Sequence, residues 1–92
     1  MTYPDLHQAL LVLGLGERAT LREIKDRHKA LVKIHHPDSG NSGDPEIIRK
    51  VNAAYRLLLD YVSAYHFCFT EDEFYEQCPE EHLRRQFMDD PF

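Results

Sequence analysis

The chain has 92 residues, of which 42% are hydrophobic and 29% charged, a composition that suits one small domain rather than two. Its two cysteines, Cys68 and Cys78, are too few to staple a secreted scaffold and lack the CxxC spacing of redox or zinc sites, and we expect neither an export signal nor a membrane span. The net charge of −5 argues against a general nucleic-acid binder, so we expect a soluble cytoplasmic domain with reduced thiols.

The first predicted helix spans residues 5–13. Three leucines at spacings of four and three residues form one apolar stripe along it: Leu6, Leu10 and Leu13. Gly14 follows as a C-cap, because glycine readily adopts the positive φ with which many helices end. The stripe needs another apolar face, so this helix should pack on the elements that follow.

Two longer helices come next and form the centre of the chain. The first begins after the capping box of Thr20 and Glu23 and ends at about residue 35 or 36, before Pro37. The other begins at Pro45, behind Asp44 as N-cap, and runs to about residue 65. Apolar residues keep helical spacing on both, namely Leu21, Ile24, Leu31 and Ile34 or His35, then Ile48, Val51, Tyr55, Leu58 and Val62. An antiparallel helical hairpin is therefore predicted, with a polar loop at its tip.

The C-terminal part has a different pattern. Tyr65, Phe67 and Phe69 alternate with other residues, which is strand periodicity, but a lone strand would have no partner, so we expect an extended aromatic strap. A capping box at Thr70 opens a short helix to about residue 77. A further helix is predicted from Cys78 to near residue 88.

The aromatic side chains of this segment would expose a large apolar patch if they had no partner. We therefore expect Phe67, Phe69 and Phe74 to pack on the hairpin near its third helix. On this expectation, truncation after Tyr65 lowers the melting temperature clearly. The alternative is that the strap is an exposed recognition segment.

Charge is distributed unevenly along the chain. Residues 20–36 carry five basic and two acidic side chains, whereas residues 66–92 carry two basic and eight acidic ones. Arg22, Lys25 and Lys29 share one face of the second helix, and Lys33 continues it. This face is either merely solvated or an electrostatic docking surface for an acidic partner, and the spacing alone leaves both open.

An HPD tripeptide, His36-Pro37-Asp38, lies in the loop between the two long helices. It is preceded by LVLGL at 11–15, ATLREIK at 19–25 and KALVK at 29–33, and followed by VNAAYRLL at 51–58. This ordered series covers roughly residues 6–59 and closely resembles the J-domain of DnaJ-type co-chaperones.

The resemblance implies an all-α, J-domain-like fold, an antiparallel helical hairpin with the HPD loop and a short N-terminal helix. The J-domain would occupy residues 1–65, and an aromatic and acidic extension, packed on it or appended to it, would occupy residues 66–92. The resemblance further implies binding to the ATP-bound state of a DnaK-type seventy-kilodalton heat-shock chaperone and stimulation of its ATP hydrolysis.

Residue by residue, the resemblance assigns three kinds of partner-binding positions. The trigger is His36, Pro37 and Asp38. The docking face is Arg22, Lys25, His28, Lys29 and Lys33, and a third-helix contact is Ile48. Asp38, held off the helix end by a rigid proline, is a fixed anion suited to pairing with an arginine of the partner.

We predict no enzymatic activity, cofactor or metal site for this chain. No glycine loop with its lysine is present to cradle phosphates, so ATP hydrolysis would belong to the partner and the chain would act on it allosterically. The histidines and cysteines lack the spacing of metal ligands.

The sequence departs from the family pattern at His28 and His35, where aromatic residues are frequent, and a basic QKRA-like stretch is missing after residue 65. An alternative function is therefore a J-like interaction scaffold that does not stimulate an ATPase. In that alternative the extension would bind another protein, and it is also the candidate segment for an unknown client.

Overall fold

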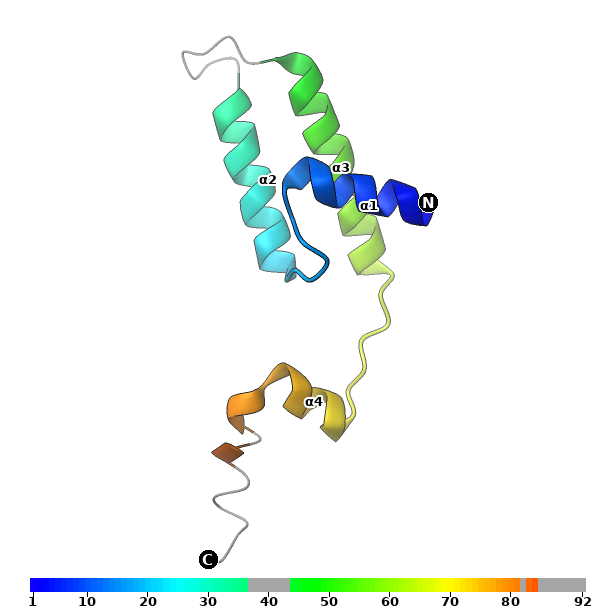
Figure 1. Cartoon of the computed structure of the whole chain (residues 1–92), viewed down its shortest axis with the longest axis vertical. Coiled ribbons are helices and arrows are strands. Elements are labelled where there is room, and N and C mark those ends of the chain that lie inside the picture. Colours follow the sequence, from blue (N-terminus) through cyan, green and yellow to red (C-terminus); the bar gives the residue numbers. More distant parts are fainter. Residues whose placement is uncertain (37–43, 82, 85–92) are drawn as a thin grey trace, which may run out of the picture.

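The computed structural model describes residues 1–36, 44–81 and 83–84 (Figure 1). Its helices are α1 (Tyr3–Leu13), α2 (Leu21–His35), α3 (Pro45–Ser63) and α4 (Glu71–Gln77), with further helical residues at 79–81 and 83–84. No described residue lies in a β-strand. The predicted all-α fold is confirmed, while the loop at the tip of the hairpin lies outside the described residues.

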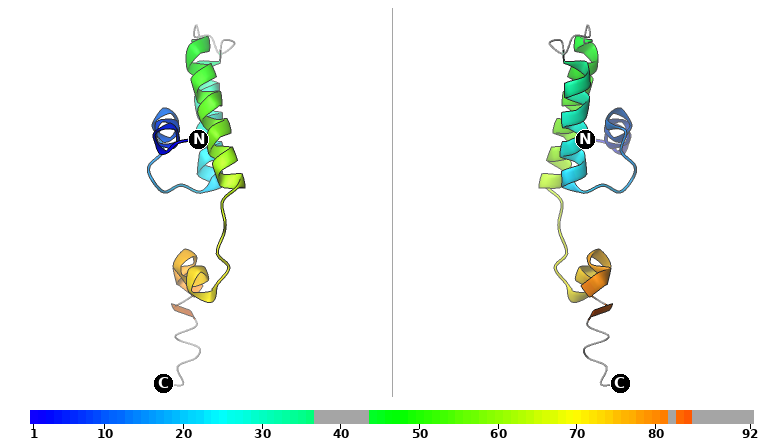
Figure 2. Two further views of the ribbon diagram at one scale, coloured as in Figure 1. Left: turned by 90° about the vertical axis from the view of Figure 1, so that its right-hand side faces the viewer. Right: turned by 90° about the vertical axis from the view of Figure 1, so that its left-hand side faces the viewer.

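Helices α2 and α3 lie side by side and antiparallel, and α1 crosses α3 on one side of this pair (Figures 1 and 2). Both α1 and α2 pack mainly on α3 and contact each other much less. The chain leaves the hairpin at the end of α3 and continues to α4, which lies beyond the hairpin in all three views.

The start of α1 differs from the sequence-based expectation by two residues. Thr2 and Asp5 form a capping box, in which the Thr2 Oγ1 accepts from the Asp5 N–H and the Asp5 carboxylate accepts from the Thr2 N–H, both at 3.2 Å. This second bond, from the backbone of Thr2, lowers the pKa of the Asp5 carboxyl group because it stabilises the charged form. Pro4 lies in the first turn, where its missing N–H is not needed.

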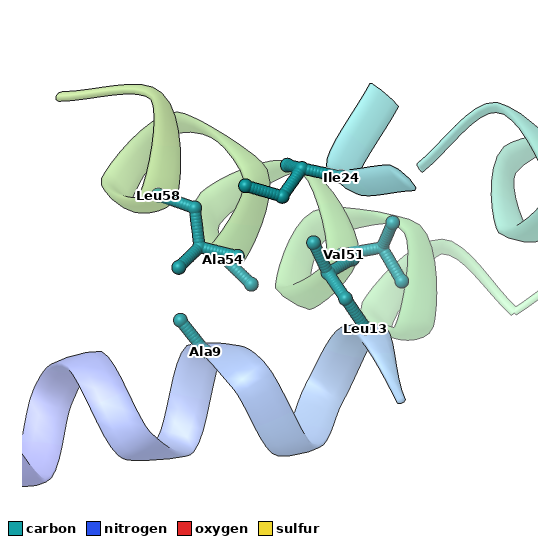
Figure 3. Packing of buried hydrophobic residues seen from close by; sticks show 6 residues of the cluster. All are labelled: Ala9, Leu13, Ile24, Val51, Ala54 and Leu58. Atoms are coloured by element: carbon teal, nitrogen blue, oxygen red, sulfur yellow. The ribbon is translucent and has the colours of Figure 1, made fainter. Parts of the chain in front are cut away.

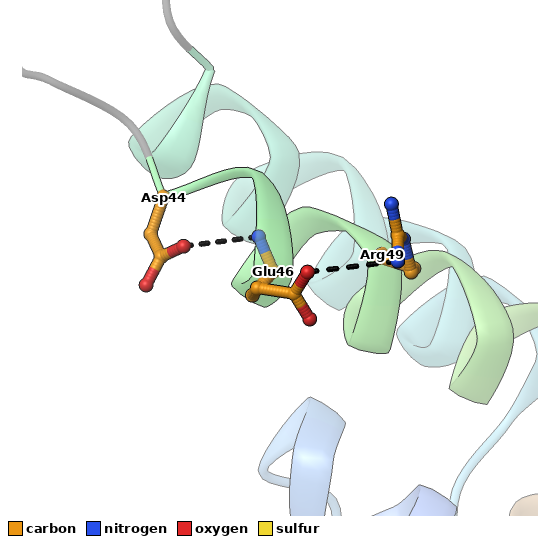
Figure 4. A network of polar contacts seen from close by, with 3 residues as sticks. All are labelled: Asp44, Glu46 and Arg49. Atoms are coloured by element: carbon orange, nitrogen blue, oxygen red, sulfur yellow. Dashed lines mark hydrogen bonds and ion pairs between the residues drawn. The ribbon is translucent and has the colours of Figure 1, made fainter.

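The predicted caps of the hairpin helices are confirmed. At the start of α2, the Thr20 Oγ1 accepts from the Glu23 N–H at 3.1 Å. At the start of α3, the Asp44 carboxylate accepts from the Glu46 N–H at 3.0 Å, and Glu46 forms an exposed ion pair with Arg49 at 3.5 Å (Figure 4). These local bonds determine where each helix begins, and hence which residues are left for the loop between them.

Among the residues that the structure describes, six are buried and form the core: Ala9, Leu13, Ile24, Val51, Ala54 and Leu58 (Figure 3). Leu31, Tyr55 and Val62 pack against it and are partly buried, as the helical spacing predicts. The prediction was wrong for Leu21, the first residue of α2, which is 43% exposed. Of the alternatives Ile34 and His35, His35 is the partly buried residue.

A contact between α1 and α2 lies beside this core. The Arg27 Nε donates to the Leu13 carbonyl oxygen at 3.0 Å, at the C-terminal end of α1 where the helix dipole favours a cation. Gly14 follows with φ 69°, and a Cβ there would lie 3.1 Å from the Arg27 Nη2. Glycine is therefore favoured at position 14 both by its backbone conformation and by the close guanidinium.

The expected packing of the aromatic strap on the hairpin is wrong. Phe67, Phe69 and Phe74 are 64%, 92% and 49% exposed, and α4 makes no contact with α1, α2 or α3. The apolar face of α3 is taken up by α1 and α2, and the strap leads away from the hairpin to a helix that packs on none of them. The strap rings contact one another instead, with centroids 5.6 Å apart for Tyr65 and Phe67.

Because no described residue after position 65 is buried, the extension should contribute little to folding. We predict that deleting residues 66–92 changes the free energy of unfolding by less than about 1 kcal/mol. Urea denaturation of the full-length and truncated chains measures this difference. As a control, Leu58→Ala, which removes a buried side chain, should cost about 2–5 kcal/mol. A clear loss of stability on truncation would contradict this prediction and show that the strap packs on the core.

Candidate functional site

The candidate site begins at the C-terminal end of α2. His36 caps this helix with extended backbone (φ −69°, ψ 134°) and is exposed. The helix stops there because a residue that precedes proline disfavours the helical conformation. Pro37 and Asp38, the other two residues of the predicted trigger, lie outside the described residues. The structure therefore locates the start of the HPD motif.

The predicted basic face lies along α2. Its four side chains are all exposed: Arg22, Lys25, Lys29 and Lys33. None of them pairs with a carboxylate of the described chain, where the ion pairs are Glu46–Arg49 and Glu81–Arg84. The acidic helix α4 makes no contact with α2. The positive charge of this face is thus available to a partner.

His28 has a different environment from the four basic residues. Its ring stacks on the Tyr55 ring with centroids 3.8 Å apart and planes 4° from parallel, and its Nε2 lies 2.9 Å from the Asn52 Oδ1. The side chain is partly buried between α2 and α3. These contacts join the two helices directly behind the basic face, so His28 holds α2 against α3. A contact of His28 with a partner stays a prediction.

Ile48 lies in the first turns of α3 and is partly buried. It precedes Asn52 by one helical turn and Tyr55 by two, so these residues share the side of α3 that meets α2. Ile48 is therefore closer to the tip of the hairpin than the His28 contact. Its role as a partner contact also stays a prediction.

Two residues that organise this region were not among the predicted site residues. Asn52 bonds His28, and Arg27 bonds the Leu13 carbonyl, but both are polar residues outside the apolar stripes. Their neighbours are 24 and 14 residues away in sequence, so no local pattern identifies them. Their contribution follows only from the way the helices meet.

The described residues contain no group of three or more histidine, cysteine, aspartate or glutamate side chains placed to hold a metal ion. Across the same residues, no helix combines the length and the apolar character that crossing a membrane requires. What the arrangement offers chemically is an exposed row of cations that leads along α2 to His36.

Comparison with known proteins agrees with this geometry. The family model described as the DnaJ domain matches residues 10–66, which is more than half of the chain. The chain belongs to the DnaJ-domain family. The match covers the last turn of α1, all of α2 and all of α3, and it ends where the aromatic strap begins.

Relatives come from bacteria and eukaryotes. The chaperone protein DnaJ of Ureaplasma parvum is 41% identical over 49 residues, covering 53% of this chain and 13% of that protein. The human DnaJ homolog subfamily C member 2 is 36% identical over 78 residues, covering 74% of this chain and 13% of that protein. The mitochondrial import inner membrane translocase subunit TIM14 of Dictyostelium discoideum is 43% identical over 51 residues, covering 55% of this chain and 43% of that protein. The chain thus spans less than half the length of each of these relatives. No solved structure matches it.

The His28 contacts give a prediction for stability. We expect His28→Ala to lower the free energy of unfolding by about 1–3 kcal/mol, because it removes both the stacking on Tyr55 and the hydrogen bond to Asn52. Lys29→Ala, one residue along on the exposed face, is the matched control and should change it by less than about 0.5 kcal/mol. Thermal and urea unfolding measure both. Equal effects of the two variants would show that His28 does not join the helices.

Proposed function

We propose that this chain is a co-chaperone that binds a DnaK-type seventy-kilodalton heat-shock chaperone and stimulates its ATP hydrolysis. The observation that carries the proposal is the unpaired basic face of α2, which leads to His36 at the tip of a DnaJ-domain hairpin. Membership of the DnaJ-domain family supports a co-chaperone role in general. Binding of this particular partner and stimulation of its ATPase are our inference from these features.

In this proposal the basic face and the HPD motif have separate tasks. Arg22, Lys25, Lys29 and Lys33 would attract an acidic surface of the chaperone and orient the hairpin on it. Asp38 would then pair with a cation of the chaperone, and His36 would donate a hydrogen bond or pack beside it. The hydrolysis itself belongs to the chaperone, so the chain would act by favouring a hydrolysis-competent conformation.

His28 and Ile48 would contribute in different ways. His28 would fix the basic face by its contacts with Asn52 and Tyr55, and its exposed edge would lie beside Lys25 and Lys29. Ile48 would offer an apolar contact near the tip of α3. Both roles require the hairpin to be formed before the partner binds.

We propose a boundary between the J-domain at residues 1–65 and the extension at residues 66–92. The family match ends at residue 66, and the described residues beyond it are not buried. The extension would then serve a client or a second partner. We propose a cytoplasmic location, because such a reducing compartment would keep thiols such as Cys68 and Cys78 free.

The first functional prediction concerns the trigger. We expect Asp38→Asn to abolish stimulated ATP turnover, because it removes the anion that pairs with the chaperone while changing the side-chain shape very little. A steady-state ATPase assay with a DnaK-type chaperone measures this, and circular dichroism checks that the fold is retained. Asp26→Asn, on the exposed surface of α2, is the matched control and should keep stimulation. Undiminished stimulation by Asp38→Asn would favour the alternative scaffold without ATPase stimulation.

The second functional prediction concerns docking. We expect the double change Lys25→Glu and Lys29→Glu to raise the half-saturating concentration by about tenfold or more at low salt, equivalent to about 1.4 kcal/mol. Stimulation by the unchanged protein should weaken as salt shortens the Debye length to about 8 Å and below. Lys50→Glu and Arg56→Glu on α3 make the same change in net charge and should have a smaller effect. Stimulation that does not depend on the salt concentration would show that the basic face is only solvated and does not dock on the chaperone.

A further inference from the structure

Four aromatic rings form a continuous row from the end of α3 into the strap. The ring centroids are 6.0 Å apart for Tyr61 and Tyr65, 5.6 Å for Tyr65 and Phe67, and 6.5 Å for Phe67 and Phe69. The rings become more exposed along the row, from 42% at Tyr61 to 92% at Phe69. We call Tyr61, Tyr65, Phe67 and Phe69 the aromatic ladder. An exposed row of this size is unusual on a protein surface without a binding role.

The backbone of the ladder is also available. The Tyr65 N–H donates to the Val62 carbonyl oxygen at 3.1 Å, and from there to Thr70 the chain belongs to no helix or strand. Within the described parts of the chain, residues 66–69 make no backbone hydrogen bonds. An extended segment with one aromatic face and unused backbone donors and acceptors can bind another extended chain along its length.

The charge that follows the ladder is strongly negative. Residues 70–84 carry six carboxylates and one arginine, and that arginine, Arg84, pairs with Glu81 at 3.7 Å. Asp72 and Glu76 are exposed one turn apart on α4. Aromatic ring faces also attract cations through their quadrupoles. Ladder and acidic helix therefore favour the same kind of ligand, with cationic ends and apolar stems.

We propose that the aromatic ladder and the acidic helix α4 form a docking strip for a cationic, apolar-rich peptide segment of another protein. Arginine or lysine side chains would stack their stems on the rings and place their charges near Asp72 and Glu76. This site is separate from the basic face of α2, which has the opposite charge. It goes beyond stimulation of an ATPase, because it binds its ligand without the chaperone.

Two other occupants are disfavoured by the same charges and contacts. The extension of a second copy carries the same negative charge and would repel this one. The basic face of the same chain has suitable chemistry, but α4 makes no contact with α2. A separate cationic protein segment is the occupant that satisfies both the rings and the carboxylates.

Fluorescence anisotropy of the full-length protein tests the proposal. The probe is a short labelled peptide of arginine, leucine and serine, and its counterpart carries glutamate in place of every arginine. We expect the cationic probe to bind and the acidic one to bind at least about tenfold more weakly. Absence of binding, or equal binding of both probes, would overturn the proposal.

Matched variants locate the binding. Phe67→Ser with Phe69→Ser should weaken binding of the cationic probe about tenfold, whereas Leu11→Ser, which removes an exposed apolar residue of α1, should not. Because all three side chains are exposed, the variants should fold normally, which circular dichroism verifies. Equal effects of ladder and control variants would overturn the proposal.

A second pair of variants tests the carboxylates. Asp72→Asn with Glu76→Gln should weaken binding by about threefold or more, and Glu17→Gln with Asp26→Asn, the same loss of charge elsewhere, should weaken it less. Light scattering then distinguishes the occupants. A dimer that dissociates in the ladder variant would show that a second copy fills the strip. Energy transfer between labels on α2 and α4 at the efficiency of direct contact would show that the chain closes on itself. Either result would overturn the assignment to a separate protein.

Discussion

The burial of Val51, Ala54 and Leu58 between α1 and α2 is the interaction on which the rest of the structure depends. These residues supply half of the core, and both other helices of the J-domain pack on the helix that carries them. Ala9 and Ala54 are small, so α1 can approach α3 closely. Because α3 takes up the apolar faces of α1 and α2, their polar faces remain outside. The cations of α2 are consequently displayed in one row on a rigid support.

The contacts between Arg27 and Leu13 and between His28 and Tyr55 complete this arrangement with polar and aromatic groups. The first fixes the end of α1 relative to α2, and the second fixes α2 relative to α3. A basic face formed from side chains on a single helix needs no further positioning by loops. Its orientation toward a partner is therefore determined by helix packing, which is less variable than the conformation of exposed segments.

Local signals in the sequence predicted most of the helical framework. Capping boxes and the Asp44-Pro45 start act through bonds within one helical turn, so Thr20 and Asp44 indicated their helices directly. The predicted start of α1 lies two residues after the observed one, because the capping box of this helix uses Asp5 where the usual pattern has glutamate or glutamine. The HPD motif and the order of helices likewise indicated the family, which rests on residues close together in sequence.

Features that depend on contacts between distant residues could not be predicted in the same way. The hydrophobicity of Phe67 and Phe69 suggested burial, but burial also requires contact with a second apolar surface, and both side chains remain exposed. The resemblance to the J-domain placed His28 with the basic residues, and the structure shows in addition that its ring is engaged by Asn52 and Tyr55. Periodicity gives the direction of a side chain on its own helix and leaves open what lies opposite.

The short connection between α3 and α4 has a consequence for the geometry of any larger assembly. Residues 64–70 join the two helices, and a segment of this length cannot extend beyond about 25 Å. A molecule held at the start of α4 would remain within this distance of the end of α3, at an effective concentration of about 1 mM or more. Weak binding to the extension would then suffice to deliver that molecule to whatever the hairpin holds. Tethering of this kind acts through proximity and requires no change in the shape of either part.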